Sequence, residues 1–365
     1  MEIRLDRNEF LIELAPMQSI VERKSTIPVL SHLLLTARDG QLRLAATDLD
    51  VSLTSWVKAD VELEGGIAVQ AKKFTEIIRA LESDTVTLRL DEPKMLTVTA
   101  AKSRFKIHGH APEDFPSLPA VEGAEGVEIP FEAVRGMINK ILFAISADES
   151  RFQLNGALLK LNSGSIEMAA TDGHRLAVVE SALETDAEES SVLVPRKALQ
   201  ELHRFDGNGA LNYRRGQHHL SFRLGRRELI CRILEGTFPD YEQVIAKDQP
   251  VSLAFDRRHL MEAIHRVALM TADRSRGVRF QFSEDGLVIS VANPDLGEAA
   301  EEVACDFSGE GFELGLNPDY VTQFLAAVET DQVRLELKDG NSQCLGSPVD
   351  GQDQRYLCVI MPMRL

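Results

Sequence analysis

Apolar and polar residues alternate along this chain in two patterns, one with the spacing of helices and one with that of strands. Apolar residues recur at helical spacing in segments 8–21, 72–81, 131–145, 195–205, 257–269 and 316–328, which are predicted as helices. Pro16 lies inside the first of these and predicts a kink or an early end. Between them, short apolar runs such as 29–36, 42–46 and 95–100 predict strands, with hairpin turns at Asp39-Gly40 and around Asn162-Ser-Gly164.

The same pattern occurs three times, which predicts a tandem repeat. The sequences Ala45-Ala-Thr-Asp48 and Ala169-Ala-Thr-Asp172 are identical and 124 residues apart, and Ile289-Ser-Val-Ala-Asn-Pro-Asp295 is a diverged third copy. Each period holds two amphipathic helices and roughly seven or eight strands, which indicates an α+β unit. We therefore expect three like domains over 1–125, 126–247 and 248–365, the first two joined by a proline-containing and acidic linker.

Composition limits the classes of function. The sequence contains no apolar run of transmembrane length, and its first residues lack the pattern of a signal peptide. The four cysteines are scattered, which favours a reducing cytoplasm with the thiols as small apolar fillers and no metal or cofactor. A formal charge of −17 argues against a membrane surface and, taken alone, against tight binding to nucleic acid.

The distribution of charge weakens that last argument, because basic residues lie on the predicted helices while acidic residues dominate strands and loops. If the helices of successive repeats lined the inside of a ring, about twelve helices from two chains would leave a hole of roughly 25 Å, whereas six would leave roughly 8 Å. B-DNA is about 20 Å across. A ring would hold DNA by topology, so tight phosphate contacts would be unnecessary. Ordinary solvated helix faces remain the alternative.

The segment Asp172-Gly-His-Arg175 allows three interpretations. Asp172 and His174 could form a catalytic pair, as in a hydrolase, but no nucleophile motif, phosphate-binding loop or metal-binding motif accompanies them. The segment could instead be a tight turn between strands, because Asp and Gly are turn residues. The third interpretation, one wall of a peptide-binding groove, is implied only by a family resemblance; for the whole chain, a three-domain peptide-binding scaffold that never encircles DNA is the alternative to a ring.

The chain resembles the bacterial DNA polymerase III β subunit, the replicative sliding clamp, over its whole length. The resemblance rests on Ala169-Ala-Thr-Asp-Gly-His-Arg-Leu176, Leu193-Val-Pro-Arg-Lys197, Gly236-Thr-Phe-Pro-Asp-Tyr241, Arg276-Gly-Val278 and Val359-Ile-Met-Pro-Met-Arg-Leu365. It implies three clamp domains per chain and a head-to-tail homodimer that forms a six-domain ring with helices lining the hole. The implied function is non-catalytic: the ring encircles duplex DNA of any sequence and confers processivity. The implied location is the bacterial cytoplasm, in association with the nucleoid.

The resemblance also implies a groove between the second and third domains that binds short motifs of partner proteins. The implied partners are the DNA polymerase III α subunit, the clamp loader δ subunit, other DNA polymerases, ligase and mismatch-repair proteins. By position, the groove would use Leu154, Thr171, Gly173, His174, Arg175, Leu176, Pro239, Val244, Asn317, Tyr320, Val359, Ile360, Met361, Pro362, Met363 and Arg364. Methionines suit a surface that accepts several peptides, and a Leu or Phe anchor would fill an apolar site. Ser275 and Asn341 stand where the resemblance predicts larger apolar groups, so the resemblance does not specify the breadth and depth of the outer part of the groove.

Two further surfaces follow from the resemblance. The dimer interface would pair the first domain of one chain with the third domain of the other, using Lys73, Arg104, Phe105, Ile107, Leu269, Met270, Glu298, Glu301 and Glu302. The DNA-facing surface would use Lys24, Lys72, Arg79, Arg151, Arg196 and Lys197. Phe152 either contacts a base or ribose or belongs to the core.

Overall fold

The computed structural model describes residues 1–365 except 22–26, 122–125, 149, 185–187, 272–276 and 351–353. These residues pack as two compact units, each made of two stretches of chain. Unit 1 contains 1–134 and 197–233, and unit 2 contains 135–196 and 234–365. Every strand pairing described below is antiparallel, as expected for an α+β protein whose strands are joined by short turns.

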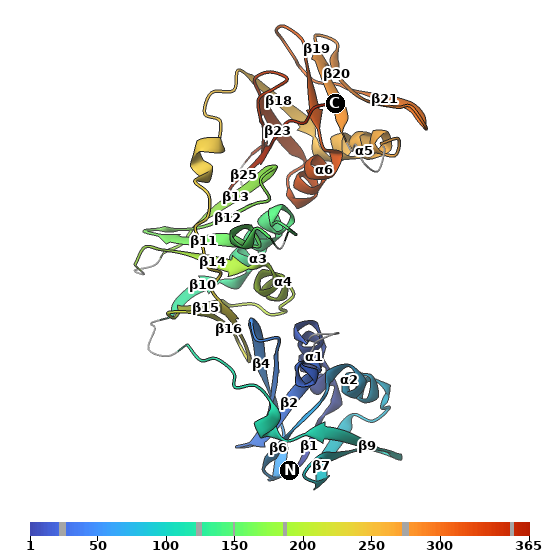
Figure 1. The fold of residues 1–365 in the computed structure, drawn as a ribbon, viewed down its shortest axis with the longest axis vertical. Helices are drawn as coiled ribbons and strands as arrows, with labels where there is room; N and C mark the ends of the chain where they lie inside the picture. Colours follow the sequence, from blue (N-terminus) through green and yellow to red (C-terminus); the bar gives the residue numbers. More distant parts are fainter. Residues whose placement is uncertain (22–26, 122–125, 149, 185–187, 272–276, 351–353) are drawn as a thin grey trace. The chain divides into compact units, whose positions relative to one another are not determined.

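Unit 1 is built on one thirteen-stranded sheet with the order β10-β15-β16-β17-β4-β3-β2-β6-β9-β8-β7-β1-β5. Its strands are β1 (Glu2–Asp6), β2 (His32–Arg38), β3 (Gln41–Thr47), β4 (Val51–Lys58), β5 (Asp60–Leu63), β6 (Gly65–Gln70), β7 (Thr85–Glu92), β8 (Met95–Ala100), β9 (Ser103–His110), β10 (Val127–Pro130), β15 (Ala210–Arg215), β16 (His219–Leu224) and β17 (Arg227–Arg232). Helices α1 (Arg7–Ile20) and α2 (Ala71–Ala80) lie side by side on it, and most of α4 (Arg196–His203) belongs to this unit (Figure 1). Short 3₁₀ turns cover Pro28–Ser31 and Pro112–Asp114.

Unit 2 has two sheets. The larger has the order β14-β11-β12-β13-β25-β24-β23-β18 and the smaller β21-β20-β19-β22. The strands are β11 (Gly156–Asn162), β12 (Ser165–Thr171), β13 (Arg175–Ala182), β14 (Ser190–Pro195), β18 (Val251–Asp256), β19 (Val278–Ser283), β20 (Gly286–Asn293), β21 (Gly297–Val303), β22 (Phe312–Leu316), β23 (Gln332–Leu337), β24 (Cys344–Pro348) and β25 (Gln354–Ile360). Its helices are α5 (Arg257–Ala268), α6 (Pro318–Ala327) and most of α3 (Phe131–Ile141) (Figure 1). 3₁₀ turns cover Leu142–Ala144, Phe152–Leu154 and Tyr241–Val244.

Caps and buried apolar faces explain where the helices lie. Asp6 accepts a hydrogen bond from the Glu9 amide at 2.8 Å and starts α1, and Asp256 does the same for α5 through His259. The predicted early end at Pro16 is wrong, because α1 continues through it to Ile20. The buried side chains of the helix, among them Phe10 and Leu14, hold it against the sheet. Packing therefore outweighs the helix-breaking tendency of proline here.

The strand predicted over 29–36 begins only at His32, because Pro28–Ser31 forms a 3₁₀ turn. Strands β1, β5, β10, β18 and β22 were not predicted from the apolar pattern; each has no more than six residues, and β22 falls just before α6. The predicted helix over 131–145 ends at Ile141 and continues as the 3₁₀ turn Leu142–Ala144.

Strand pairing joins segments from successive repeats inside each unit. In unit 1, β4 pairs with β17, and in unit 2, β13 pairs with β25. We call these pairings the first junction and the second junction. The repeated Thr-Asp sequence lies at the start of each, in the turn that precedes β4 or β13.

Candidate peptide-binding site

The turn between β12 and β13 is held by the side chains of Thr171 and Asp172. The Oδ1 atom of Asp172 accepts hydrogen bonds from the backbone amides of His174 at 2.9 Å and Arg175 at 3.1 Å. Thr171 Oγ1 accepts from the Gly173 amide at 3.0 Å and donates to the Arg175 carbonyl at 2.6 Å. Gly173 has a φ of +89°, a value that favours glycine. These bonds present His174 at the tip of the turn.

Arg175 is a buried cation with a partner for each side of its guanidinium. It is 8 % exposed, and its Nε lies 3.1 Å from Asp172 Oδ2. One terminal nitrogen donates to the Gln323 side chain, and the other donates to the Phe143 carbonyl at 2.5 Å. The Cζ atom lies 4.3 Å from the centroid of the Tyr320 ring and 5.0 Å from that of Phe143. Arg175 therefore fixes the turn to α6 and to the end of α3, where loss of any one partner would leave a buried charge unsatisfied.

His174 and Tyr320 form an aromatic pair beside this cation. Their ring centroids are 6.4 Å apart with an interplanar angle of 21°. Asn317 caps α6 by accepting a hydrogen bond from the Asp319 amide at 2.9 Å, which places Tyr320 in the first turn of that helix. Burial raises the pKa of the Tyr320 hydroxyl, with a further contribution from the Asp172 carboxylate. The pair presents an aromatic surface with polar edges.

The last residues of the chain run along this surface. The Met361 amide donates to the His174 carbonyl at 2.8 Å, and the Met363 amide donates to the Gly315 carbonyl at 2.9 Å. A Cβ at Gly315 would lie 2.3 Å from the Met363 carbonyl oxygen, so only glycine allows this approach. At Gly277 a Cβ would lie 2.6 Å from the end of the Leu365 side chain, which can rotate away, so the restriction there is weaker. Two glycines on β19, β22 and their flanks thus make room for the tail.

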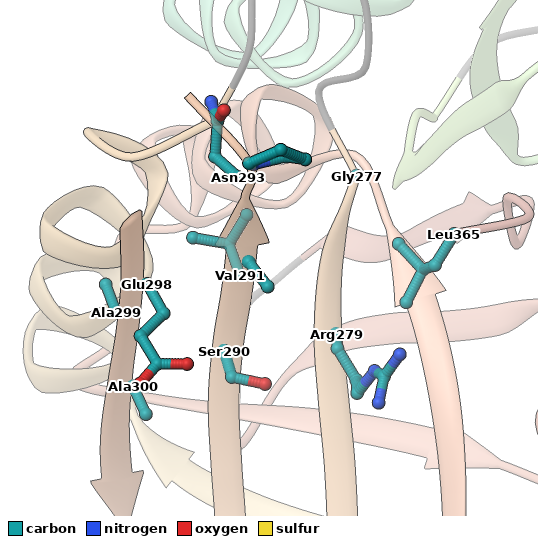
Figure 2. A pocket seen from close by; sticks show the side chains of 11 residues that line it. Gly277, Arg279, Ser290, Val291, Asn293, Glu298, Ala299, Ala300 and Leu365 are labelled. Carbon is teal, nitrogen blue, oxygen red and sulfur yellow. The ribbon is translucent and has the colours of Figure 1, made fainter. Parts of the chain in front are cut away.

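Leu365 also borders a pocket of about 500 Å³ on the smaller sheet of unit 2. Figure 2 shows Leu365 and Glu298 on opposite sides of it, with Ser290 and Val291 on the strand between them and Arg279 below the leucine. Arg279 forms an ion pair with Glu313 at 3.4 Å. The pocket extends from the tail toward β21, which carries acidic residues predicted to lie at the dimer interface.

An apolar cluster lies under the turn. It contains Leu154, Leu176 and Val359, which are 5 %, 3 % and 2 % exposed, packed with Phe238 and Tyr241. Of the remaining predicted residues, Pro239, Val244, Met361 and Arg364 are exposed, and Pro362 and Met363 are half-buried. All of the predicted groove residues lie in unit 2.

Ile360 is 1 % exposed and follows Val359 along β25. Successive side chains of a strand point to opposite faces, so Ile360 supports the strand from the other face and does not line the apolar cluster.

A pocket of about 480 Å³ lies on the same strands, further from the turn. It is lined by Val178, Leu357 and Leu345 together with the segment 241–247. At its edge Tyr241 donates to the Glu167 carboxylate and accepts from Lys160 Nζ at 2.7 Å. Burial and the bond to Glu167 raise the pKa of the Tyr241 hydroxyl to about 12. Burial opposes the charge of Lys160, but its bonds to Tyr241 and Glu167 outweigh this and raise its pKa.

The basic residues predicted to face DNA are in different settings. Lys72 and Arg79 are exposed on α2, seven residues apart and so on one side of that helix. Lys197 is instead engaged, with its Nζ 2.5 Å from Asp48 Oδ2 and 2.8 Å from the Ile20 carbonyl. Arg196 is half-buried and reaches the Ile145 carbonyl at 3.5 Å. Lys24 lies outside the described residues.

Arg151, predicted to face DNA, lies beside the turn of the peptide site, because its Nη1 donates to the Asp172 carbonyl at 3.3 Å. Its neighbour Phe152 is 69 % exposed and so does not belong to the core. Asn341 is exposed and its amide donates to Asp339 at 2.9 Å, while Ser275 lies outside the described residues.

The residues predicted at the dimer interface carry exposed apolar groups. Leu269 is 69 % exposed and Phe105 is 37 % exposed, whereas Ile107 and Met270 are half-buried. The charged candidates have partners within the chain. Lys73 contacts Glu76 at 2.6 Å, Arg104 lies 3.8 Å from Asp91, and Arg266 Nε lies 2.9 Å from Glu301. Glu298 and Glu302 are exposed.

The geometry does not favour the hydrolase hypothesis. One carboxylate oxygen of Asp172 accepts hydrogen bonds from backbone amides, and the other binds Arg175. The His174 ring stacks on Tyr320 and is not the partner of this carboxylate. Across the described ranges, no group of three His, Cys, Asp or Glu side chains is arranged to hold a metal ion. Among helices in the part of the chain that the structure describes, none has the length and apolar character needed to cross a membrane.

Several contacts of the site were not predicted from the sequence. Gln323 and the Phe143 carbonyl bind Arg175, and Gly277 and Gly315 receive the tail. A glycine near or within a strand can mark a close backbone approach, so Gly315 offered a weak signal. No comparable signal marks Gln323, which is one polar residue among many on helices.

Comparison with known proteins identifies the family. Three family models match this chain. The N-terminal, central and C-terminal domains of the DNA polymerase III beta subunit match residues 1–119, 128–240 and 242–364, in that order. The beta sliding clamp of Pseudomonas aeruginosa is 36 % identical and that of Vibrio cholerae 30 %, each over the full length of both chains.

Solved structures agree. The crystal structure of the DNA polymerase III subunit beta from Pseudomonas aeruginosa has a TM-score of 0.93 at 35 % identity, covering all of both chains. The clamp from Bartonella birtlesii bound to griselimycin has a TM-score of 0.94 at 30 % identity over all of both chains. With three family domains in tandem and full-length relatives above 30 % identity, this chain belongs to the DNA polymerase III beta subunit family, the bacterial beta sliding clamps.

Proposed function

We propose that this chain acts as a replicative sliding clamp by closing with a second copy into a ring around duplex DNA. The domain boundaries 1–125, 126–247 and 248–365, close to the spans of the three family descriptions, are part of the proposal. The protein is a processivity subunit without catalytic activity of its own, and it works in the bacterial cytoplasm at the nucleoid.

The ring is tethered to its partners through the candidate peptide site. The observation that carries this proposal is the convergence of a fixed cation, an aromatic pair and the methionine-containing tail on one apolar cluster. Apolar clusters edged by a few fixed polar groups suit short peptides with an apolar anchor. The partners are the DNA polymerase III α subunit, the clamp loader δ subunit, other polymerases, ligase and mismatch-repair proteins.

Loading onto plasmid DNA tests the ring. The protein is loaded by an ATP-driven clamp loader onto a nicked circular plasmid, which is then linearised by a restriction enzyme. We expect the protein to stay on the circle and to leave the linear DNA, because only free ends release a closed ring. Equal retention on both forms contradicts the ring and favours the open peptide scaffold.

A charge-reversal pair separates the DNA-facing surface from the peptide site. Lys72→Glu combined with Arg79→Glu places two acids on α2 and should weaken loading at least about tenfold, since phosphate contacts are lost and repulsion is added. Peptide affinity should stay unchanged. Arg38→Glu, at an exposed end of β2, is the matched control and should load normally. If the α2 pair loads as well as the control, this helix does not face DNA.

A further inference from the structure

The first and second junctions share one backbone frame. In the second, Leu176 pairs with Val359 and Val178 with Leu357, and in the first, Ser52 pairs with Ile230 and Thr54 with Glu228. In both junctions the end of the second strand is bonded in the same way to the turn that precedes the first. The Met361 amide donates to the His174 carbonyl at 2.8 Å, and the Arg232 amide donates to the Asp50 carbonyl at 2.9 Å.

The turns that open the two junctions are also equivalent. Asp48 accepts from the Asp50 and Val51 amides at 3.0 and 2.7 Å, as Asp172 does in the second junction. Leu49 has a φ of +81° where Gly173 has +89°. The second carboxylate oxygen of Asp48 binds Lys197, in the role that Arg175 has for Asp172. The cation of the repeat is therefore kept, although it comes from a different strand or helix.

Each junction is crossed by a similar loop with a pocket beneath it. In the first junction the loop is 112–121, and the pocket of about 410 Å³ is lined by Ser52, Thr54, Glu228 and Ile230. In the second junction the loop is 241–247, and the pocket of about 480 Å³ is lined by Val178 and Leu357.

The floors of the two junctions differ in chemistry. Leu176 and Val178 are replaced by Ser52 and Thr54, which are 3 % and 5 % exposed, and Leu357 is replaced by Glu228. The Ser52 hydroxyl is 2.8 Å from that of Thr47, and Glu228 accepts from Ser221 at 2.8 Å. An apolar anchor placed here would pack against buried hydroxyls and remove water from the half-buried Glu228 carboxylate without offering a hydrogen bond in return, which is unfavourable.

We infer that the first junction is a second copy of the peptide site whose polar floor excludes apolar anchors, so that each chain binds one partner motif. Ser52, Thr54 and Glu228 are the specificity-determining residues. The inference rests on the proposed peptide binding at the second junction and adds the reason why the repeat does not produce two equivalent sites. It also separates two properties of the site: the backbone frame comes from the repeat, and acceptance of an apolar anchor depends on the side chains of the floor.

Native mass spectrometry of the full-length protein with a short peptide carrying a leucine anchor tests the inference. Wild-type protein should bind one peptide per chain. The variant Ser52→Leu/Thr54→Val/Glu228→Leu should bind two, with the new site weaker than the original, because its floor then matches the second junction while Asp50 stands where the second junction has His174. The converse change, Leu176→Ser/Val178→Thr, should weaken the original site by about 100-fold.

The outcomes distinguish this inference from the proposed function. Wild-type protein that binds no peptide contradicts the proposed function. Wild-type protein that binds two per chain, or a folded triple variant that still binds one, contradicts only the inference. Thermal unfolding reports whether the triple variant folds. If it does not, the near-isosteric Thr54→Val in wild-type protein should give a detectable second binding event at high peptide concentration, and its absence overturns the inference.

Discussion

At the scale of single residues, one aspartate of the repeat performs two tasks at once. In Asp172 and Asp48 alike, one carboxylate oxygen closes a turn by binding two backbone amides and the other binds a cation. The turn requires a short acceptor side chain, which is why Asp recurs, whereas the cation can be supplied by Arg175 or by Lys197. The two cations are not equivalent, because the planar guanidinium of Arg175 binds partners in a fixed geometry and packs on the Tyr320 ring, whereas the ammonium of Lys197 is a compact charge on a flexible stem.

Arg175→Ala should destabilise unit 2 by about 3 kcal/mol, because it leaves the mostly buried Asp172 carboxylate without its partner. Peptide affinity should fall at least about tenfold as the His174–Tyr320 pair loses the cation that it packs on. Arg175→Lys should restore little of either property, since an ammonium on a flexible stem cannot reach Gln323 and the Phe143 carbonyl together.

Thermal unfolding and fluorescence polarisation with a labelled peptide measure the two effects. Arg355→Ala on the neighbouring strand is the control, because its side chain is 67 % exposed and lies 3.8 Å from Glu180. It should change stability by less than about 1 kcal/mol. Equal effects of Arg175→Ala and Arg355→Ala would show that the Arg175 contacts have no special role.

At the scale of elements, close approaches and buried ion pairs decide how strands and helices meet. The tail can lie across β22 only because Gly315 has no side chain. Helix α1 is fixed to β17 by Glu13, which binds Arg227 Nε at 2.8 Å and Ser55 Oγ at 2.6 Å with both charged groups buried. Both contacts join segments that are far apart in the sequence.

Gly315→Ala should displace the tail and lower peptide affinity about tenfold while changing stability little, since the strand itself tolerates alanine. Fluorescence polarisation measures affinity, and hydrogen exchange at the Met363 amide reports the lost bond to residue 315. Gly136→Ala is the control, because a Cβ there meets only the Gln354 side chain at 3.9 Å and the helix favours alanine. Slow exchange at Met363 in the Gly315 variant would contradict the expected displacement.

Glu13→Leu should destabilise unit 1 by about 3–5 kcal/mol, because it leaves the buried charge of Arg227 without an ion-pair partner. The double variant Glu13→Leu/Arg227→Met should recover most of the loss, since an apolar pair replaces the ion pair. Hydrogen exchange of the β17 amides measures local stability in the full chain. Arg226→Ala removes a 52 % exposed partner of Glu9 and should have little effect. A double variant no more stable than Glu13→Leu would refute this account.

The elements show how far the sequence could predict the structure. The apolar spacing located all six long helices to within a few residues, and the repeated Thr-Asp sequence located the equivalent turns. The sequence could not show that α1 continues through Pro16, because the helix is held there by the burial of Phe10 and Leu14 against the sheet. It also could not show that Lys197 binds Asp48, because this pair depends on a contact between residues 149 positions apart. The groove residues, Tyr320 on α6 among them, were predicted by resemblance, whereas Gln323 on the same helix was not predicted.

At the scale of the whole molecule, a net charge of −17 is at odds with association with DNA, although the helices carry basic residues. The proposed ring would reconcile the two, because enclosure would replace affinity and the net negative charge would limit unspecific association. Such a ring depends on a contact between two copies. Within the chain, Lys73, Arg104 and Glu301 already have local partners, so charge pairing between copies has less to contribute than the exposed apolar groups Leu269 and Phe105.

Leu269→Asp should therefore convert the dimer into a monomer, because it puts a charge into a contact that would otherwise exclude water from an apolar group. Sedimentation velocity at micromolar concentration measures the change, and retention on circular DNA should disappear with it. Lys73→Glu should leave most of the protein dimeric, since Lys73 pairs with Glu76 in its own chain. Leu63→Asp is the matched control, a 60 % exposed leucine on β5 outside the predicted interface. If Leu269→Asp remains a dimer while Lys73→Glu dissociates, charge pairing holds the two copies together and the apolar contact is secondary.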